Sequence, residues 1–267
     1  MKILLTNDDG VISQGIQIIS RMLSEKGWLA AVVGPDRERS GAGRSITVDR
    51  PVRVRPLDPG IFAPAIPAYS CDGTPTDCVN VGLSSLFPSA DCVVSGINQG
   101  PNMSDDVTYS GTVCAAMEGL TRGRQSVAVS LCSKNGDSFR HNMTAALVAM
   151  AVLEYIEKNP LPAGAMLNVN VPNLLIKNVK GVKLTHRGRR SGGGDVITVK
   201  DPHGNDSYWI TGATGYEYEE GGDVSAVNDG YVSVTPIQLD MTHYDLLVDM
   251  RSRDVDSKLT RTLKLES

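Results

Sequence analysis

The first ten residues, MKILLTNDDG, constrain the fold of this chain more than any other stretch. Residues 2–6 form a short apolar run with no charge after Lys2, which is typical of a strand buried on both faces of a parallel sheet. Polar residues ending in Asp8 and Asp9 follow at once, and the apolar residues after Gly15 recur with helical spacing. The stretch therefore predicts a strand, a loop with two adjacent carboxylates, and a helix.

Further apolar strands and amphipathic helices alternate up to about residue 182, which predicts a doubly wound α/β core over residues 1–182. Thr74 followed by Pro75 predicts the start of a helix that runs to about Leu86. Two proline-rich segments are expected to be edge strands. The predicted strands lie at 2–6, 28–33, 47–57, 65–71, 91–95, 126–131 and 166–171, and the longest predicted helix covers 139–158.

The pattern changes after residue 182. Short strand-like segments at 196–199, 207–210 and 231–235 are separated by Gly, Asp and Asn turns without a helical pattern, so we expect a β-hairpin-rich appendage over residues 183–245. The basic, glycine-rich segment 187–195 is expected to be a mobile surface loop. Residues 246–267 form a charged tail whose four-residue apolar spacing predicts a short helix.

Length and composition restrict the functional classes. A chain of 267 residues buries one large core, which suffices for an enzyme. With 26 basic and 30 acidic residues, the net charge of −4 argues against a general nucleic-acid-binding or membrane-binding surface. There is no apolar run of membrane-spanning length and no signal-peptide pattern, so we expect a cytoplasmic protein. The five cysteines are scattered, which favours buried thiols over disulfides or zinc ligands.

Three predicted loops at strand ends supply oxygen ligands. Asp8 and Asp9 follow the first strand, Ser40 follows the second, and Asn98 and Asn102 follow the strand at 91–95. Adjacent carboxylates repel each other, and a cation relieves that repulsion. Carboxylate, amide and hydroxyl oxygens prefer Mg²⁺, Mn²⁺ or Ca²⁺ to zinc. The pattern therefore predicts a divalent-metal site, although an Asp-Asp pair also occurs as a simple turn or helix cap.

Ser110, Gly111 and Thr112 precede a predicted helix, and a helix N-terminus binds phosphate through its free N–H groups. Taken alone, this tripeptide is better explained as a routine helix cap. Metal site and helix terminus together suggest phosphate-ester hydrolysis, in which the cation polarises the phosphoryl oxygen and an aspartate takes a proton from water. The second acidic pair, Asp105 and Asp106, is expected to be solvated or to cap the following loop.

Six ordered motifs resemble the SurE family of survival proteins, which are metal-dependent 5′-nucleotidases. The motifs are TNDDG at 6–10, GPDRERSGAG at 34–43, CDGTPTDCV at 71–79, VSGINQGPN at 94–102, DDVTYSGTV at 105–113 with AAMEG at 115–119, and GYVSVTPIQLDMT at 230–242. The resemblance implies a Rossmann-like fold. It extends to about residue 245, but segments 187–195 and 215–222 depart from the family pattern, and 246–267 match nothing assigned.

The resemblance also implies roles for particular residues. Asp8, Asp9, Ser40 and Asn98 would bind one divalent cation, Mg²⁺ or Mn²⁺, with the two aspartates catalytic. The phosphate pocket would consist of Asn102, Ser110, Gly111 and Thr112. The implied substrates are nucleoside 5′- and 3′-monophosphates, together with short polyphosphate. The implied assembly is a homodimer or homotetramer that exchanges a C-terminal segment.

Two other functions fit parts of the pattern. A receiver-like signalling domain also places an acidic pair around Mg²⁺ after its first strand, but it needs a phospho-accepting aspartate where this chain has Asn98. A dinucleotide-binding oxidoreductase would carry GxGxxG after the first strand, and this chain lacks that motif there.

Overall fold

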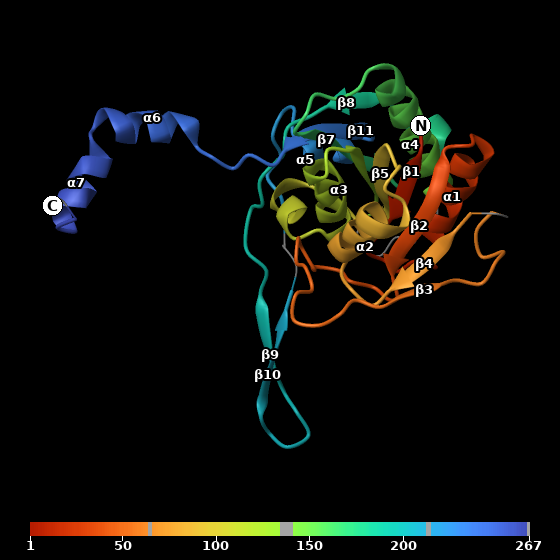
Figure 1. Ribbon diagram of the computed structural model, residues 1–267, viewed down its shortest axis with the longest axis horizontal. Coiled ribbons are helices and arrows are strands. Elements are labelled where there is room, and N and C mark those ends of the chain that lie inside the picture. The colour runs from red at the N-terminus through yellow and green to blue at the C-terminus, as the bar shows by residue number, and fades with distance from the viewer. Residues whose placement is uncertain (64–65, 134–140, 212–214, 266–267) are drawn as a thin grey trace. The chain divides into compact units, whose positions relative to one another are not determined.

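The computed structural model describes residues 1–63, 66–133, 141–211 and 215–265. A sheet of nine strands, in the order β3-β4-β2-β1-β5-β6-β7-β11-β8, forms its centre (Figure 1). The pairs linking β4, β2, β1, β5, β6 and β7 are all parallel, and β3 runs antiparallel to β4. The strands are β1 Ile3–Thr6, β2 Leu29–Pro35, β3 Val54–Pro56, β4 Ala68–Cys71, β5 Cys92–Gln99, β6 Gln125–Cys132, β7 Ala165–Pro172, β8 Val182–Leu184 and β11 Val232–Gln238.

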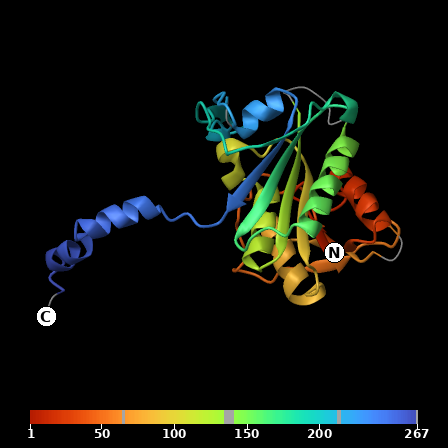
Figure 2. The same ribbon diagram turned by 90° about the horizontal axis from the view of Figure 1, so that it is seen from above.

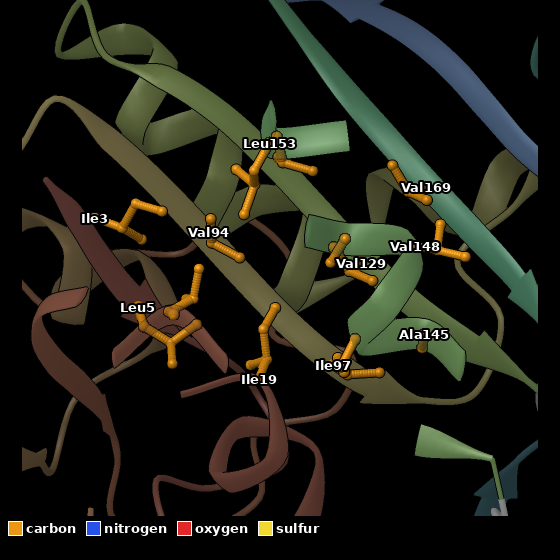
Figure 3. Packing of buried hydrophobic residues seen from close by; sticks show 14 of the residues in the cluster. Ile3, Leu5, Ile19, Val94, Ile97, Val129, Ala145, Val148, Leu153 and Val169 are labelled. Carbon is orange, nitrogen blue, oxygen red and sulfur yellow. The ribbon is translucent and has the colours of Figure 1, made fainter. Parts of the chain in front are cut away.

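Helices cover both faces of this sheet, which confirms the predicted α/β class. Helix α1 packs beside α4, and α2 packs beside α3 (Figure 2). Side chains of β1 alternate between the two layers. Ile3 and Leu5 join the core on the α1–α4 side (Figure 3). Leu4 joins the core with α2. The helices are α1 Gln14–Glu25, α2 Pro75–Val81, α3 Gly111–Thr121 and α4 Asn142–Lys158.

Local sequence signals place these helices well. Thr74 accepts a hydrogen bond from the backbone N–H of Asp77, whose side chain bonds back to Thr74 N–H, and Pro75 opens α2. Helix α2 ends at Val81 and continues as a π-helical turn, Gly82–Leu86. The predicted start of α4 at Phe139 lies outside the described residues, as does the predicted start of β4 at Ala65.

Strand β5 is longer than predicted. The expected loop from Gly96 onward is wrong up to Gln99, because pairing with β6 resumes after an irregularity, with Asn98 opposite Ser130. The backbone of Gly96 has φ of +136°, and a Cβ atom there would lie 2.3 Å from the Val129 carbonyl oxygen, so only glycine fits. Strand β3 is shorter than the expected 47–57 segment.

Residues 183–245 are less separate than the predicted appendage. Strands β8 and β11 belong to the nine-stranded sheet, and helix α5 (Asp223–Asn228) lies where the pattern predicted no helix. The predicted hairpin is present: β9 (Val196–Lys200) pairs antiparallel with β10 (Asp206–Ile210) as a separate ribbon (Figure 1). The strand expected at 231–235 is therefore part of the core and not of a hairpin.

The chain divides into a unit of residues 1–237 and a unit of residues 238–267. The second unit contains α6 (Tyr244–Ser252) and α7 (Val255–Thr262), neither of which has a buried residue, so the predicted short terminal helix is accompanied by another helix. Across the described part of the chain, no helix is both long and apolar enough to cross a membrane.

Candidate functional site

Asp8 and Asp9 lie in the loop at the carboxyl end of β1. Strand β1 pairs with β2 on one side and β5 on the other, so this loop lies where the chain order of the strands reverses. Open α/β sheets bind ligands at such a switch point. Asp9 Oδ2 accepts a hydrogen bond from the backbone N–H of Gln99 over 3.2 Å, which joins the β1 loop to the end of β5.

The N-terminus of α3 meets Asp8. Ser110 is the N-cap, and its hydroxyl accepts a hydrogen bond from Val113 N–H over 3.0 Å. The Thr112 hydroxyl donates to Asp8 Oδ1. A Cβ atom on Gly111 would lie 2.8 Å from Asp8 Cβ and 2.9 Å from Asp8 Oδ2, so glycine permits this close approach. The helix end predicted to bind phosphate is therefore placed directly against the first aspartate.

Both aspartates hold protons more tightly than free carboxyl groups. Burial raises the pKa of Asp8, although hydrogen bonds from Thr112 oppose the shift. Burial and the neighbouring charge of Asp8 raise the pKa of Asp9 from 3.8 to about 7. Glu38 adds to both upward shifts by like-charge repulsion. The site thus concentrates negative charge that a cation or a proton would stabilise.

Ser40 lies in the loop after β2, next to a residue that bonds to Asp8. The backbone N–H of Arg39 donates to the Asp8 carbonyl oxygen over 2.8 Å, which holds the loop after β2 against the loop after β1. The exposed Ser40 hydroxyl donates to Glu38 Oε1 over 2.6 Å. Its predicted role as a metal ligand stays a prediction.

The two asparagines are placed differently. Asn98 is half-buried near the end of β5, and its side-chain amide donates to the Gly100 carbonyl oxygen over 2.9 Å. Asn102 is buried, and its amide donates to the Ser130 hydroxyl over 2.8 Å. The Asn102 side chain is thus engaged within the protein, while its predicted part in phosphate binding stays a prediction.

Several supporting residues escaped prediction. The side chains of Asn168 and Asn170 donate to the Asn102 carbonyl oxygen over 2.8 and 3.0 Å, and Asn170 also accepts Asn102 N–H. Their two-residue spacing in a strand that is otherwise apolar was the available signal. Asn7 donates to the Gly10 carbonyl oxygen over 2.8 Å and so shapes the loop that carries the aspartates. No sequence pattern around Glu38 indicated that it would lie near the aspartates.

The donor set fits a hard divalent cation. Asp8, Asp9 and Asn98 come from neighbouring strand ends and offer carboxylate and amide oxygens, which such ions prefer. The described residues contain no group of three His, Cys, Asp or Glu side chains suited to a metal. A cation here would therefore complete its shell with amide or hydroxyl oxygens, water or substrate. The five cysteines are free and buried, as predicted.

Comparisons with known proteins place the chain in one family. The model of the family described as "Survival protein SurE" matches residues 3–193. The protein named 5′-nucleotidase SurE from Legionella pneumophila (strain Lens) is 47% identical over 249 residues, covering 92% of this chain and 94% of its own. Its namesake from Stenotrophomonas maltophilia (strain R551-3) is 46% identical over 255 residues, covering 94% of this chain and 95% of its own.

A solved structure supports the same assignment at the level of the fold. The crystal structure of SurE protein from Aquifex aeolicus superposes with a TM-score of 0.80 at 38% sequence identity. The match covers 95% of this chain and 100% of that chain. Because the family model matches more than half of the chain and the relatives match nearly all of it, this chain belongs to the SurE family.

Proposed function

We propose that this protein is a metal-dependent phosphomonoesterase that hydrolyses nucleoside 5′-monophosphates to nucleoside and phosphate. The observation that carries the proposal is the contact between the N-terminus of α3 and Asp8. It combines an anion-binding helix end with a pair of carboxylates in one place. The relatives named 5′-nucleotidase SurE add support from outside the structure.

One divalent cation, Mg²⁺ or Mn²⁺, held by Asp8, Asp9, Asn98 and Ser40 would polarise the phosphoryl oxygen and lower the pKa of water. The chain itself supplies orientation and proton transfer. Thr112 fixes Asp8 by its hydroxyl, and the positive end of the α3 dipole would attract the phosphate. Gln99 N–H donates to Asp9 Oδ2 and so orients this carboxylate, and one of the two aspartates would take a proton from the attacking water.

The proposal extends to finer properties that rest on the family resemblance. The same pocket would accept nucleoside 3′-monophosphates and short polyphosphate. The protein would act in the cytoplasm. It would assemble as a homodimer or homotetramer that exchanges a C-terminal segment, which would cover the exposed apolar side chains of β9 and β10.

Phosphate release from AMP and GMP, with and without Mn²⁺ or Mg²⁺, tests the central proposal. We expect release only with a cation, and a loss of at least ~1,000-fold in kcat/KM for Asp8→Asn, because both the carboxylate charge and its contact with Thr112 are weakened. Asp58→Asn is the matched control, since Asp58 is exposed and lies in a loop away from this site. Full activity in Asp8→Asn, or activity in excess EDTA, contradicts the proposal.

A receiver-like role makes the opposite prediction. A phospho-accepting protein would become stably labelled by acetyl phosphate, whereas a phosphomonoesterase would release free phosphate. Membership of the SurE family, over a sheet of nine strands, favours the hydrolase.

A further inference from the structure

His186 lies at the base of the segment that leaves the core after β8 and returns to it before α5. Residues 185–191 form the outgoing stem of this segment, and residues 215–222 form its returning stem. His186 N–H donates to the Gly221 carbonyl oxygen, and Asp223 N–H donates to the His186 carbonyl oxygen, both over 3.0 Å. The backbone of His186 is therefore fixed where the two stems meet, and its side chain is exposed there.

The His186 ring contacts one carbonyl oxygen from each stem. Nδ1 lies 3.3 Å from the Arg187 carbonyl oxygen. Nε2 lies 3.2 Å from the carbonyl oxygen of Glu220, which is 34 residues further along the chain. A Cβ atom on Gly221 would lie 3.4 Å from Nε2, so the glycine leaves room for the ring against the returning stem. The ring thus links the two stems.

The protonation state of the ring decides how many of these contacts are hydrogen bonds. A carbonyl oxygen only accepts, so each contact needs an N–H group on the ring. The neutral imidazole has one N–H group and one lone pair, whereas the imidazolium has two N–H groups. In the neutral ring a lone pair would face one of the carbonyl oxygens and repel it. The geometry therefore matches the protonated ring of His186.

Charged groups on the neighbouring segments also favour the cation. Glu219 of the returning stem and Asp223 at the start of α5 attract a positive ring. The one adjacent cation, Arg187, lies 3.8 Å from Asp105 Oδ1, so a carboxylate offsets its charge. The surroundings of His186 therefore stabilise its protonated form.

The link between the stems should for this reason be strongest at acidic pH. Hydrogen bonds to the carbonyl oxygens of Arg187 and Glu220 raise the pKa of His186 above its ordinary value of 6.5, the nearby carboxylates add to the rise, and a small loss of hydration opposes it. Because the folded state binds this proton more tightly, the stabilisation is complete below pH 6.5 and is lost as the pH rises through the folded pKa.

We propose that His186 is a pH-sensitive link, bonded to both stems when its ring is protonated and to one stem when its ring is neutral. The segment between the stems carries β9 and β10 (Figure 1). The link therefore sets how often the base of this hairpin opens, and opening becomes more frequent above neutral pH. The proposal is independent of hydrolysis at Asp8 and Asp9.

An NMR titration of the histidine rings in the full chain tests the protonation of His186 directly. The signal is assigned by its absence in His186→Gln, or through the backbone resonances of the wild type. We expect a pKa above 6.5, because two carbonyl oxygens accept from the charged ring. A pKa at or below 6.5 would overturn the proposal.

Hydrogen–deuterium exchange tests the connection between the ring and the stems. After correction for the intrinsic effect of pH, the amides of His186 and Asp223 should be protected at least ~3-fold more at pH 5.5 than at pH 8, because only the charged ring makes both bonds. In His186→Gln the protection should be the same at both values, since glutamine does not titrate.

His203→Gln is the matched control, because it removes an exposed histidine from the turn between β9 and β10. Its protection at the stems should depend on pH as that of the wild type does. Protection that still depends on pH in His186→Gln would assign the effect to another group and reject the link. Loss of the pH dependence in both variants would reject it as well.

Discussion

Gly111 lies where the first turn of α3 meets Asp8, and its missing side chain makes that contact possible. In Gly111→Ala, the new Cβ atom would lie 2.8 Å from Asp8 Cβ and 3.1 Å from Pro75 Cγ, so one side must move. We expect kcat/KM for AMP to fall on the order of 100-fold and the free energy of unfolding to fall by about 1–3 kcal/mol. Steady-state kinetics and thermal unfolding measure the two effects.

Gly193→Ala is the control for that substitution. No atom lies within 4 Å of a Cβ atom built there, and its φ lies outside the left-handed region. Its kinetics should match those of the wild type. A Gly111→Ala enzyme with normal kcat/KM would show that the spacing between α3 and Asp8 is not critical.

The raised pKa of Asp9 predicts competition between protons and metal. Mn²⁺ requires the carboxylate, so its affinity should fall up to ~10-fold for each pH unit below about 7. The stabilisation of the wild type by a fixed Mn²⁺ concentration should therefore be larger at pH 8 than at pH 5.5, as measured by thermal unfolding. Equal stabilisation at both values would contradict the role of Asp9 as a ligand.

In the metal-free protein, the contribution of Asp9 to stability should change with pH in the opposite direction. Burial raises the pKa of Asp9 above its unfolded value of 3.8 to about 7, so the folded state binds the proton more tightly. The resulting stabilisation is complete below pH 3.8 and is lost as pH rises through 7. In EDTA, Asp9→Asn should raise Tm by roughly 5 °C at pH 8 and have little effect near pH 4. A lower Tm at pH 8 would contradict this reading.

For the individual residues of the candidate site, sequence motifs predicted which residues lie there but not which of them bond to each other. Asp8 and Asp9 follow a recognisable strand, and Ser110 carries the signal of a helix cap, which the structure confirms. The bond from Thr112 to Asp8 joins residues 104 positions apart. No local pattern encodes such a contact, because it depends on how α3 packs beside the end of β1.

Asp106 holds the base of the β9–β10 hairpin against the segment that precedes α3. It accepts hydrogen bonds from Arg190 Nη2 and from the Tyr216 hydroxyl, and Arg190 N–H donates to Asp105 Oδ2 over 3.0 Å. The Arg190 guanidinium also lies 5.2 Å from the centre of the Tyr109 ring. The pair was predicted to be solvated or to cap the loop before Ser110. The Asp105 side chain is 44% exposed, so the solvated alternative is wrong for Asp106 only. Part of segment 187–195 is anchored.

Asp106→Asn should loosen the hairpin base, because an amide cannot replace both charge-assisted bonds. We expect backbone amide exchange around Ser191 and Glu217, which bond to the opposite stem, to become roughly 10-fold faster. Hydrogen–deuterium exchange with mass spectrometry measures it. Asp195→Asn is the control, since its side chain is exposed and its carbonyl oxygen alone bonds to Thr211. Equal effects of both variants would reject Asp106 as the anchor.

Elements with local signals were predicted better than those fixed by distant pairing. The central strands stood out because buried parallel strands are continuous apolar runs, and the hairpin stood out by its turns. The extension of β5 to Gln99 depends on pairing with β6, and the return of β11 to the main sheet depends on β7 and β8. The sequence of β5 or β11 alone does not show which strand it pairs with.

Both units of the chain have exposed apolar side chains. On the hairpin, Trp209 is 69% exposed and Ile210 is 82% exposed. Within the second unit, α6 and α7 expose apolar residues of their own, including Leu246 and Leu259. Exposed apolar side chains of this kind mark a candidate site of association on each unit, in line with the proposed oligomer.

Trp209→Glu/Ile210→Glu should therefore reduce the assembly to a smaller species at micromolar concentration, because burying two carboxylates costs more than the apolar contacts return. Size-exclusion chromatography with light scattering gives the mass. Ser207→Glu, on the same exposed strand, adds one charge without removing apolar surface and should keep the wild-type mass. An unchanged mass in the double variant would place the interface elsewhere.

Backbone hydrogen bonds join the two ends of the segment between β8 and β11. The backbone N–H of His186 donates to the Gly221 carbonyl oxygen, and Asp223 N–H donates to the His186 carbonyl oxygen, both over 3.0 Å. The segment between His186 and Gly221 can therefore change in length and sequence while β11 keeps its pairing register with the neighbouring strands. In the proposed oligomer, such a design would let evolution, or an engineer, alter how copies associate without changing the candidate site at the carboxyl end of β1.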